Sequence, residues 1–190
     1  MDAATDLELV RRAKAGEQRA FEELVRRHQD RAYSVARGVV RTPEDAADVA
    51  QEAFIAVLRH LDTFQEGAAF TTWLHRITLR KAYDHLRRRV PDPVDPGAGP
   101  VANLEARDAD PFATGLEQRA LLDAIGALDQ AFRDAVLLVD VAGLGVEEAA
   151  AALGVAPGTI KSRVFRGRAA LARELGTRGV GPASERVQDG

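Results

Sequence analysis

Hydrophobic residues recur every three or four positions along much of this chain, which predicts amphipathic helices. The clearest series is Ala46, Val49, Ala50, Ala53, Phe54, Val57, Leu58 and Leu61. It follows Thr42, a predicted N-cap residue, and Pro43, which suits the first helical position. Glu44 and Asp45 place negative charge in the first turn, where it stabilises the helix dipole. We therefore predict a helix that begins at residue 43 and buries this stripe.

Similar signals predict two helices before this one. An apolar stripe from Phe21 to Val39 predicts a helix that begins near Glu17. Ahead of it, Asp6 is the predicted N-cap of a short helix, and Gly16 is its stop.

Glycines and loops divide the rest of the chain. A loop at 62–69 leads to a predicted helix at 70–88. In the second half, Gly143 and Gly154 separate the candidates, which are helices at 116–128, 130–141, 145–153 and 158–175. Strand-like alternation is not found, so the predicted class is all-α.

The composition changes abruptly at residues 90–115. This segment holds five of the eight prolines, five acidic residues and one arginine. Such a sequence favours an extended, flexible linker. We expect two small helical modules at 5–89 and 116–176, joined by this linker, and a disordered tail at 177–190.

Bulk composition excludes several classes of protein. There is no cysteine, so disulfides and thiolate metal sites are ruled out. No apolar run approaches the roughly 18 residues of a membrane span, and Met1 is followed by an acid rather than a basic signal region. We therefore expect a cytoplasmic protein without membrane insertion.

The net charge of −3 hides two basic stretches. Residues 71–89 carry six basic residues and one acid, and residues 157–173 carry five basic residues and no acid. Each stretch alone is compatible with a solvated helix face. Together, on an acidic whole, they suit a protein that binds DNA weakly alone and needs a partner to hold it there.

Residues 146–164 have the spacing of a helix-turn-helix. Gly154 is the expected left-handed turn residue, and Ile160 and Val164 are expected to face inward. The second helix would then present its N-terminal part to a major groove. Candidate base contacts are Lys161, Ser162, Phe165 and Arg166, and candidate phosphate contacts are Thr159, Arg163 and Arg168. An ordinary helical hairpin with an arginine-rich face is the alternative.

The helix that begins at residue 43 also carries acids away from its apolar stripe. Asp45, Asp48 and Glu52 share one face, with Gln51 and Ile55 beside them. Offsetting the helix dipole explains the acids of the first turn but explains Glu52 less well. No histidine accompanies them at ligand spacing, which disfavours a metal site. A docking surface for a basic protein is the other interpretation, and spacing alone does not decide.

The helix at 70–88 and the loop before it are the second DNA candidate. Trp73 is more typical of a core residue than of a stacking platform. The loop offers Phe64 as an aromatic wall and Gln65 as an amide for an extruded base.

These motifs together resemble bacterial sigma factors. Asp45-Ala-Ala-Asp-Val-Ala-Gln-Glu-Ala-Phe54 resembles the polymerase-docking motif of that family. The segment from Phe64 to Arg88 resembles the motif that follows it, and the segment from Gly158 to Arg168 is similar to the C-terminal recognition helix. The short length points to the extracytoplasmic-function (ECF) group.

The resemblance implies a set of partners and contacts. Core RNA polymerase would be bound through the clamp helices of its largest subunit by Asp45, Asp48, Gln51, Glu52, Phe54 and Ile55. The minus-ten promoter element would be opened and read by Phe64, Gln65, Phe70, Thr71, Thr72, Trp73, His75, Arg76, Arg80, Arg87 and Arg88. The minus-thirty-five element would be read by the helix-turn-helix residues given above. An anti-sigma factor would be a further partner.

Two departures from the family pattern fall in the minus-ten region. Arg80 stands where the family usually has asparagine, and Gln65-Glu66 replaces an arginine-containing start of the loop.

A stand-alone operator-binding regulator is the alternative function, but it would leave the N-terminal module without a role. Neither a phosphate loop nor a nucleophile–base pair is evident, so we expect no enzyme, cofactor or small-molecule substrate.

Overall fold

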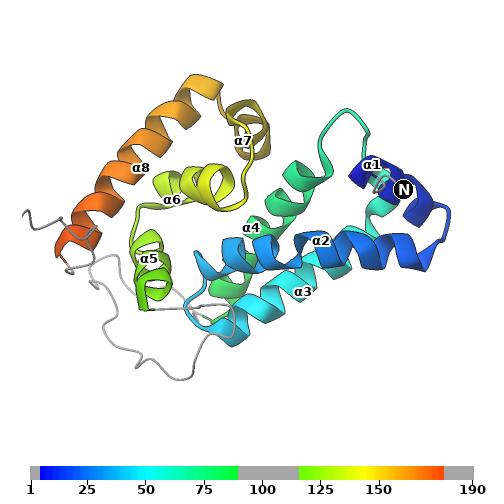
Figure 1. The fold of residues 1–190 in the computed structure, drawn as a ribbon, viewed down its shortest axis with the longest axis horizontal. Helices are drawn as coiled ribbons and strands as arrows, with labels where there is room; N and C mark the ends of the chain where they lie inside the picture. The colour runs from blue at the N-terminus through cyan, green and yellow to red at the C-terminus, as the bar shows by residue number, and fades with distance from the viewer. Residues whose placement is uncertain (1–4, 90–115, 178–190) are drawn as a thin grey trace, which may run out of the picture.

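The structure is a computed structural model that describes residues 5–89 and 116–177, and its elements are helical (Figure 1). The first stretch contains α1 (Asp6–Lys14), α2 (Gln18–Arg37), α3 (Pro43–Arg59), the 3-10 turn η1 (Leu61–Thr63) and α4 (Phe70–Arg89). The second contains α5 (Leu116–Gly126), α6 (Gln130–Val136), the π-helical segment η2 (Leu137–Val141), α7 (Val146–Leu153) and α8 (Pro157–Thr177).

The predicted all-α class with two helical modules is confirmed. The predicted linker at 90–115 and residues 178–190 of the predicted tail lie outside the described residues, whereas Thr177, the first residue of that predicted tail, ends α8. Within the described stretches, no helix is both long and apolar enough to cross a bilayer.

The N-terminal module is built on the three long helices α2, α3 and α4, which pack against one another. The centre of this packing is closed to solvent, with side chains at most 1% exposed at Leu24, Val49, Val57 and Leu74. Burying a side chain of this kind stabilises the fold by roughly 1.5–3 kcal/mol. The apolar stripes predicted for α2 and α3 therefore supply this core.

Capping residues begin α1 and α3. Thr42 caps α3 as predicted, because its Oγ1 accepts the backbone N–H of Asp45 at 3.1 Å. The predicted cap of α1 is wrong by one residue: Thr5, not Asp6, forms a capping box with Glu8. Asp6 instead binds α2, with its carboxylate 2.7 Å from His28 Nε2 and 3.2 Å from Arg27 Nη1. Asp6 therefore fixes α1 against α2 rather than starting the helix.

The C-terminal module contains the predicted helix-turn-helix, α7 followed by α8. Gly154 ends α7 with φ +66°, the left-handed conformation that its position predicted. Ile160 and Val164 of α8 are buried, also as predicted. Gly167 lets α8 approach α6, because a Cβ there would lie 2.6 Å from Val136 Cγ2.

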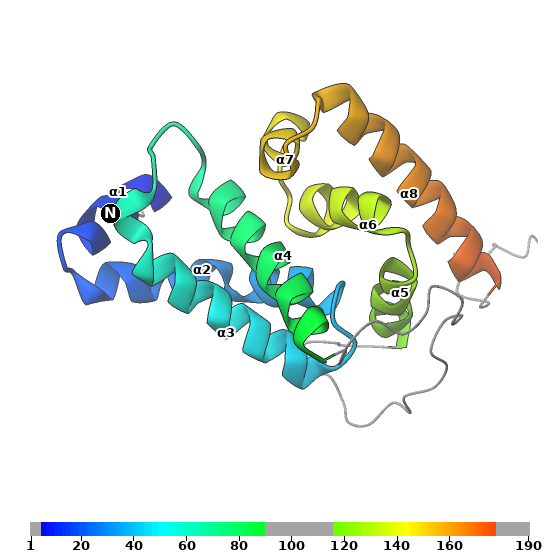
Figure 2. The same ribbon diagram turned by 180° about the vertical axis from the view of Figure 1, so that it is seen from behind.

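The two modules pack against each other in this structure (Figures 1 and 2). α4 contacts α7, and α2 contacts η2. At the second contact, a Cβ on Gly38 would overlap the side chain of the fully buried Leu137. One cluster of buried residues therefore runs through both modules.

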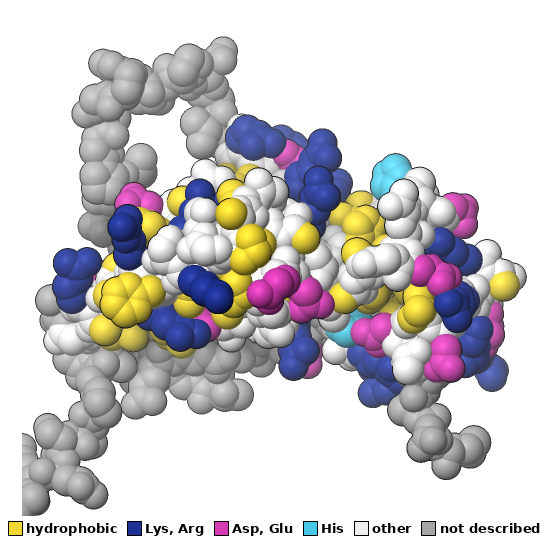
Figure 3. All heavy atoms as spheres, turned by 90° about the horizontal axis from the view of Figure 1, so that it is seen from above, with side chains coloured by type: hydrophobic (Ala, Val, Ile, Leu, Met, Phe, Trp, Pro, Cys, Tyr) yellow, Lys and Arg dark blue, Asp and Glu magenta, His cyan; other side chains and the backbone are white. Residues whose placement is uncertain are grey.

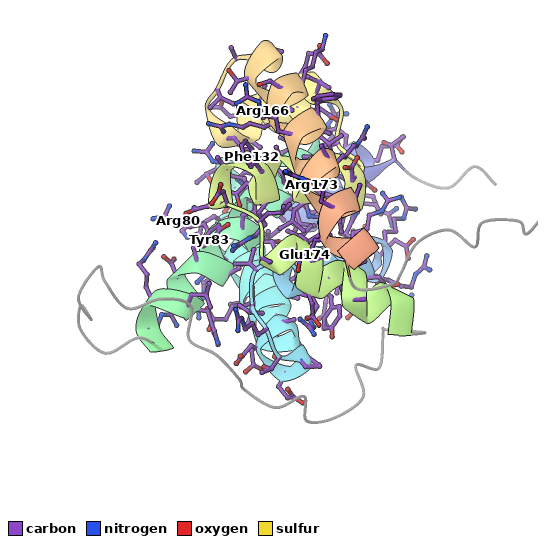
Figure 4. All side chains as sticks on the ribbon, turned by 90° about the vertical axis from the view of Figure 1, so that its left-hand side faces the viewer. Arg80, Tyr83, Phe132, Arg166, Arg173 and Glu174 are labelled. Atoms are coloured by element: carbon purple, nitrogen blue, oxygen red, sulfur yellow. The ribbon has the colours of Figure 1, made fainter. Side chains whose placement is uncertain are left out.

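A hydrogen bond crosses the same boundary. The Tyr83 hydroxyl on α4 donates to the Asp134 carboxylate on α6, and Figure 4 shows Tyr83 at the α4 side of this boundary. Burial raises the pKa of Tyr83 and also that of Asp134. Both groups are therefore partly removed from water by the packing of the modules.

Candidate docking and nucleic-acid surfaces

The α3 face is an exposed surface made by Asp48, Gln51, Ile55 and Leu58, which follow one another at intervals of three or four residues. Ile55 is 41% exposed and Leu58 is 54% exposed. Large apolar side chains beside an acid on one helix face are typical of a protein interface. The exposure of Leu58, which the sequence pattern placed in the core, therefore supports the docking interpretation of this helix.

Two expectations for α3 differ from the structure. Leu58 was expected to be buried, but the core side of the helix end is filled by Val57 and Leu61. Leu58 directly follows Val57, and adjacent helical residues point about 100° apart, so it faces outward. Phe54 was expected to contact polymerase, but it is 7% exposed and belongs to the hydrophobic core.

Two further acids of α3, Asp45 and Glu52, are paired with α4. Asp45 lies 3.0 Å from His85 Nε2, and the Glu52 carboxylate lies 3.5 Å from Lys81 Nζ and 3.6 Å from Arg88 Nη1. Glu52 therefore borders the α3 face, whereas Asp45 serves the packing of α3 against α4.

The candidate minus-ten residues fall into a buried and an exposed group. Phe64, Phe70, Thr72 and His75 are at most 7% exposed. Gln65, Arg76, Arg80, Arg87 and Arg88 are exposed, and Thr71 and Trp73 are half-buried. The exposed group provides basic side chains along α4 and an amide in the 64–69 loop, which suits contacts with a nucleic-acid backbone and base.

The buried aromatic residues anchor both ends of the 64–69 loop. The rings of Phe64 and Phe70 are 6.2 Å apart, edge to face, and Trp73 is 5.2 Å from Phe64. His28 of α2 lies 5.5 Å from Phe70. These residues hold the loop in place; in this structure they do not offer a free stacking surface.

His75 is completely buried, contrary to the expectation that it contacts DNA. Burial, with smaller contributions from the nearby His28 and Arg31, lowers its pKa to about 4. Neither ring nitrogen has a hydrogen-bond partner among the described residues. His75 is therefore a neutral core residue at neutral pH.

The recognition helix α8 presents the candidate minus-thirty-five residues. Lys161, Ser162, Phe165 and Arg166 are all exposed, and Phe165 is 76% exposed. Figure 3 shows basic side chains around hydrophobic ones at the end of the molecule that α8 forms, and Figure 4 shows Arg166 on that helix. An exposed aromatic residue among cations is compatible with a major groove, where an apolar side chain can touch a thymine methyl group.

The flanking residues are more constrained than the sequence suggested. Thr159 and Arg163 are half-buried. Arg168 forms a bidentate ion pair with Asp140 of η2, at 2.5 and 3.1 Å. The positive charge of Arg168 is therefore compensated by a residue from another helix, which the charge count along α8 could not reveal.

Comparison with known proteins matches both modules. Residues 24–90 match the family Sigma-70 region 2, and residues 118–171 match Sigma-70, region 4. The chain is 40% identical over 174 residues to the ECF RNA polymerase sigma factor SigM of Mycobacterium tuberculosis, covering 90% of this chain and 85% of that one. It is 36% identical over 177 residues to the ECF RNA polymerase sigma-E factor of Escherichia coli, covering 88% of this chain and 92% of that one. The chain belongs to the ECF sigma factors.

Solved structures agree with this assignment. The structure of CnrH in complex with the cytosolic domain of CnrY matches this sigma factor with a TM-score of 0.66 and 30% identity, covering 89% of this chain and 96% of that one. The sigma factor RpoE of Bartonella quintana, in complex with the anti-sigma factor NepR, shares the fold with a TM-score of 0.62 at 23% identity. The match covers 82% of this chain and 96% of that one.

Proposed function

We propose that this ECF sigma factor binds core RNA polymerase through the α3 face and directs initiation at specific promoters. One observation carries the proposal: an exposed acidic and apolar surface lies on one module, and an exposed basic recognition helix lies on the other. The first surface suits a basic protein partner, and the second suits DNA. Residues 5–89 would dock on polymerase and open the minus-ten element, and residues 116–176 would read the minus-thirty-five element.

The contacts within this scheme follow side-chain exposure. Gln65 and the arginines of α4 would meet the minus-ten element, while Phe64 and Phe70 hold the loop that carries Gln65. Lys161, Ser162, Phe165 and Arg166 would meet the base edges of the minus-thirty-five element. The protein would act in the cytoplasm as a DNA-binding regulator rather than as an enzyme.

An anti-sigma factor is the third proposed partner. The related protein CnrH was solved with the cytosolic domain of CnrY bound to it. The α3 face gives such a protein an exposed apolar site on this chain, formed by Ile55 and Leu58.

Polymerase dependence is the direct test of the proposal. Duplex promoter DNA is titrated with this protein alone, with core polymerase alone and with both. We expect specific binding and run-off transcription only with both, because the net charge of −3 leaves the free chain little electrostatic attraction to DNA. Tight, specific binding without polymerase would instead support a stand-alone regulator.

A substitution on the α3 face tests the docking surface. Asp48→Lys reverses the charge of an exposed side chain off the apolar stripe, so the helix should stay folded while co-purification with core polymerase is lost. Asp30→Lys, at an exposed position on α2, is the matched control and should leave polymerase binding unchanged. Equal binding by both variants and the wild type would remove α3 from the interface.

A further inference from the structure

Besides the aromatic residues at its ends, the 64–69 loop is supported by α1, a helix to which the family resemblance gave no role. α1 lies beside this loop in both ribbon views (Figures 1 and 2). Between the buried residues Phe64 and Phe70, every residue of the loop is exposed. The loop's own Ala68 N–H to Gln65 carbonyl bond is long, at 3.3 Å. The loop therefore needs contacts from outside to keep one conformation.

Arg11 of α1 supplies the first contact. Its Nε and Nη2 donate to the two carboxylate oxygens of Glu66, at 2.9 and 2.5 Å. This bidentate pairing fixes orientation as well as distance. Arg11 also lowers the pKa of Glu66, so the carboxylate stays ionised and paired at neutral pH.

Lys14, one turn further along α1, supplies the second contact. Its Nζ donates to the backbone carbonyl of Phe64 at 2.8 Å and lies 5.8 Å from the centre of the Phe64 ring. Arg11 and Lys14 are three residues apart, so they share one face of the helix. Their targets, Phe64 and Glu66, flank Gln65 on both sides. The backbone that presents the Gln65 amide is thus held at two points.

α1 is itself firmly attached to the module. Leu9 and Val10 are at most 3% exposed and pack into the core. At the start of the helix, Asp6 is paired with Arg27 and His28 of α2. Arg11 and Lys14 therefore extend from a fixed support toward the loop.

The ion pair also changes the charge of the loop. An unpaired Glu66 would place a negative charge beside the phosphates of a DNA strand and repel them. Arg11 cancels that charge. In the sequence, Glu66 is part of a departure from the family pattern, and its partner Arg11 comes from 55 residues earlier in the chain.

The geometry points to Arg11 and Lys14 as positioning residues for minus-ten recognition: they orient Gln65 and neutralise Glu66 without themselves touching a base. This inference rests on the proposed function, because it assumes that the 64–69 loop meets the opened strand.

A double-mutant cycle with reconstituted holoenzyme tests the role of Arg11. Open-complex formation is measured by permanganate reactivity of minus-ten thymines. Arg11→Ala should lower it about two- to fivefold, the range of an exposed ion pair, since it leaves Glu66 unpaired. Arg11→Ala combined with Glu66→Ala should recover the part of the loss that comes from the unpaired charge of Glu66, while the part that comes from the lost anchor should remain. Arg12→Ala is the matched control, because Arg12 lies on the same helix but pairs with Glu17.

Base preference tests the role of Lys14. Lys14→Ala should flatten the preference among the four bases at the minus-ten position nearest Gln65, and Lys14→Arg should retain it, because arginine also donates to the Phe64 carbonyl. General destabilisation would not restrict the change to one promoter position.

The outcomes distinguish a failure of this inference from a failure of the proposed function. If wild-type holoenzyme initiates but Arg11→Ala and Lys14→Ala match it in yield and preference, the inference is overturned. An equal loss from Arg12→Ala would also overturn it, by indicating a general effect of α1. If wild-type protein fails to bind polymerase, the proposed function fails, and the inference fails with it.

Discussion

The fully buried His75 gives this protein a specific dependence on pH. The pKa of His75 is lowered from 6.5 to about 4 in the folded protein. The unfolded chain therefore takes up this proton first as the pH falls, and stability declines between pH 6.5 and pH 4. The difference in pKa corresponds to about 3 kcal/mol across that window.

His75→Leu should remove this contribution. Urea unfolding at pH 7.5 and at pH 5 measures it, and the variant should lose less free energy of unfolding than the wild type between the two conditions. At pH 7.5 the variant should be no less stable, since it replaces two buried ring nitrogens without partners among the described residues by apolar atoms. If both proteins lose the same free energy of unfolding between pH 7.5 and pH 5, His75 is not buried in solution.

Arg166 tests base reading at the scale of one side chain. It is exposed on α8 beside Phe165. If it reads a guanine, Arg166→Ala should cost about 1–3 kcal/mol and relax preference at one position of the minus-thirty-five element. Holoenzyme binding to a set of single-base promoter variants provides the measurement. Uniform weakening across the set would make Arg166 a phosphate contact.

At the scale of elements, close packing outweighs helix propensity at Gly167. Alanine normally stabilises a helix interior relative to glycine by roughly 1 kcal/mol. A Cβ at Gly167, however, would lie 2.6 Å from Val136 Cγ2, and a β-branched side chain has little rotamer freedom to yield. We expect Gly167→Ala to destabilise the protein by about 1–3 kcal/mol. Gly176→Ala, with nothing within 4 Å, is the control and should be neutral or stabilising in thermal unfolding.

Most helices could be predicted from the sequence because their signals are local. Apolar spacing placed α2 and α3, and glycines with positive φ marked the stops after α1 and α7. The Thr5–Glu8 capping box is also a local signal, although Asp6 is the N-cap predicted from the sequence. The predicted helix at 130–141 continues as the π-helical η2 from Leu137, a change in hydrogen bonding that an apolar pattern does not encode.

The candidate site was less predictable because exposure depends on tertiary contacts. The recognition helix has a solvent side, so Lys161 and Arg166 are exposed as expected. α4 packs against α2 and α3 and also against α7, so few of its sides remain free and His75 and Thr72 are buried. The partners of Glu66 and Arg168 come from distant elements, and no local pattern could supply them.

For the whole molecule, the proposed function requires the two modules to separate. Promoter elements centred about 25 base pairs apart lie about 85 Å apart along B-form DNA, at about 3.4 Å per base pair. Modules joined by the Tyr83–Asp134 hydrogen bond and by Leu137 against Gly38 cannot reach both elements. Docking on polymerase must therefore break this interface. The free energy needed to separate the modules reduces the apparent affinity for polymerase.

Loosening the interface should then strengthen binding. Gly38→Ala inserts a Cβ against the fully buried Leu137, and Tyr83→Phe removes the donor to Asp134. Both variants should show a larger radius of gyration by small-angle scattering and a lower Kd for core polymerase. Gly67→Ala, at a position with nothing within 4 Å, controls for substitution of glycine and should change neither quantity. If the variants expand but bind polymerase no better, the closed arrangement does not oppose docking. An intramolecular interface that competes with polymerase must, when it is weakened, leave the protein with a higher affinity for polymerase.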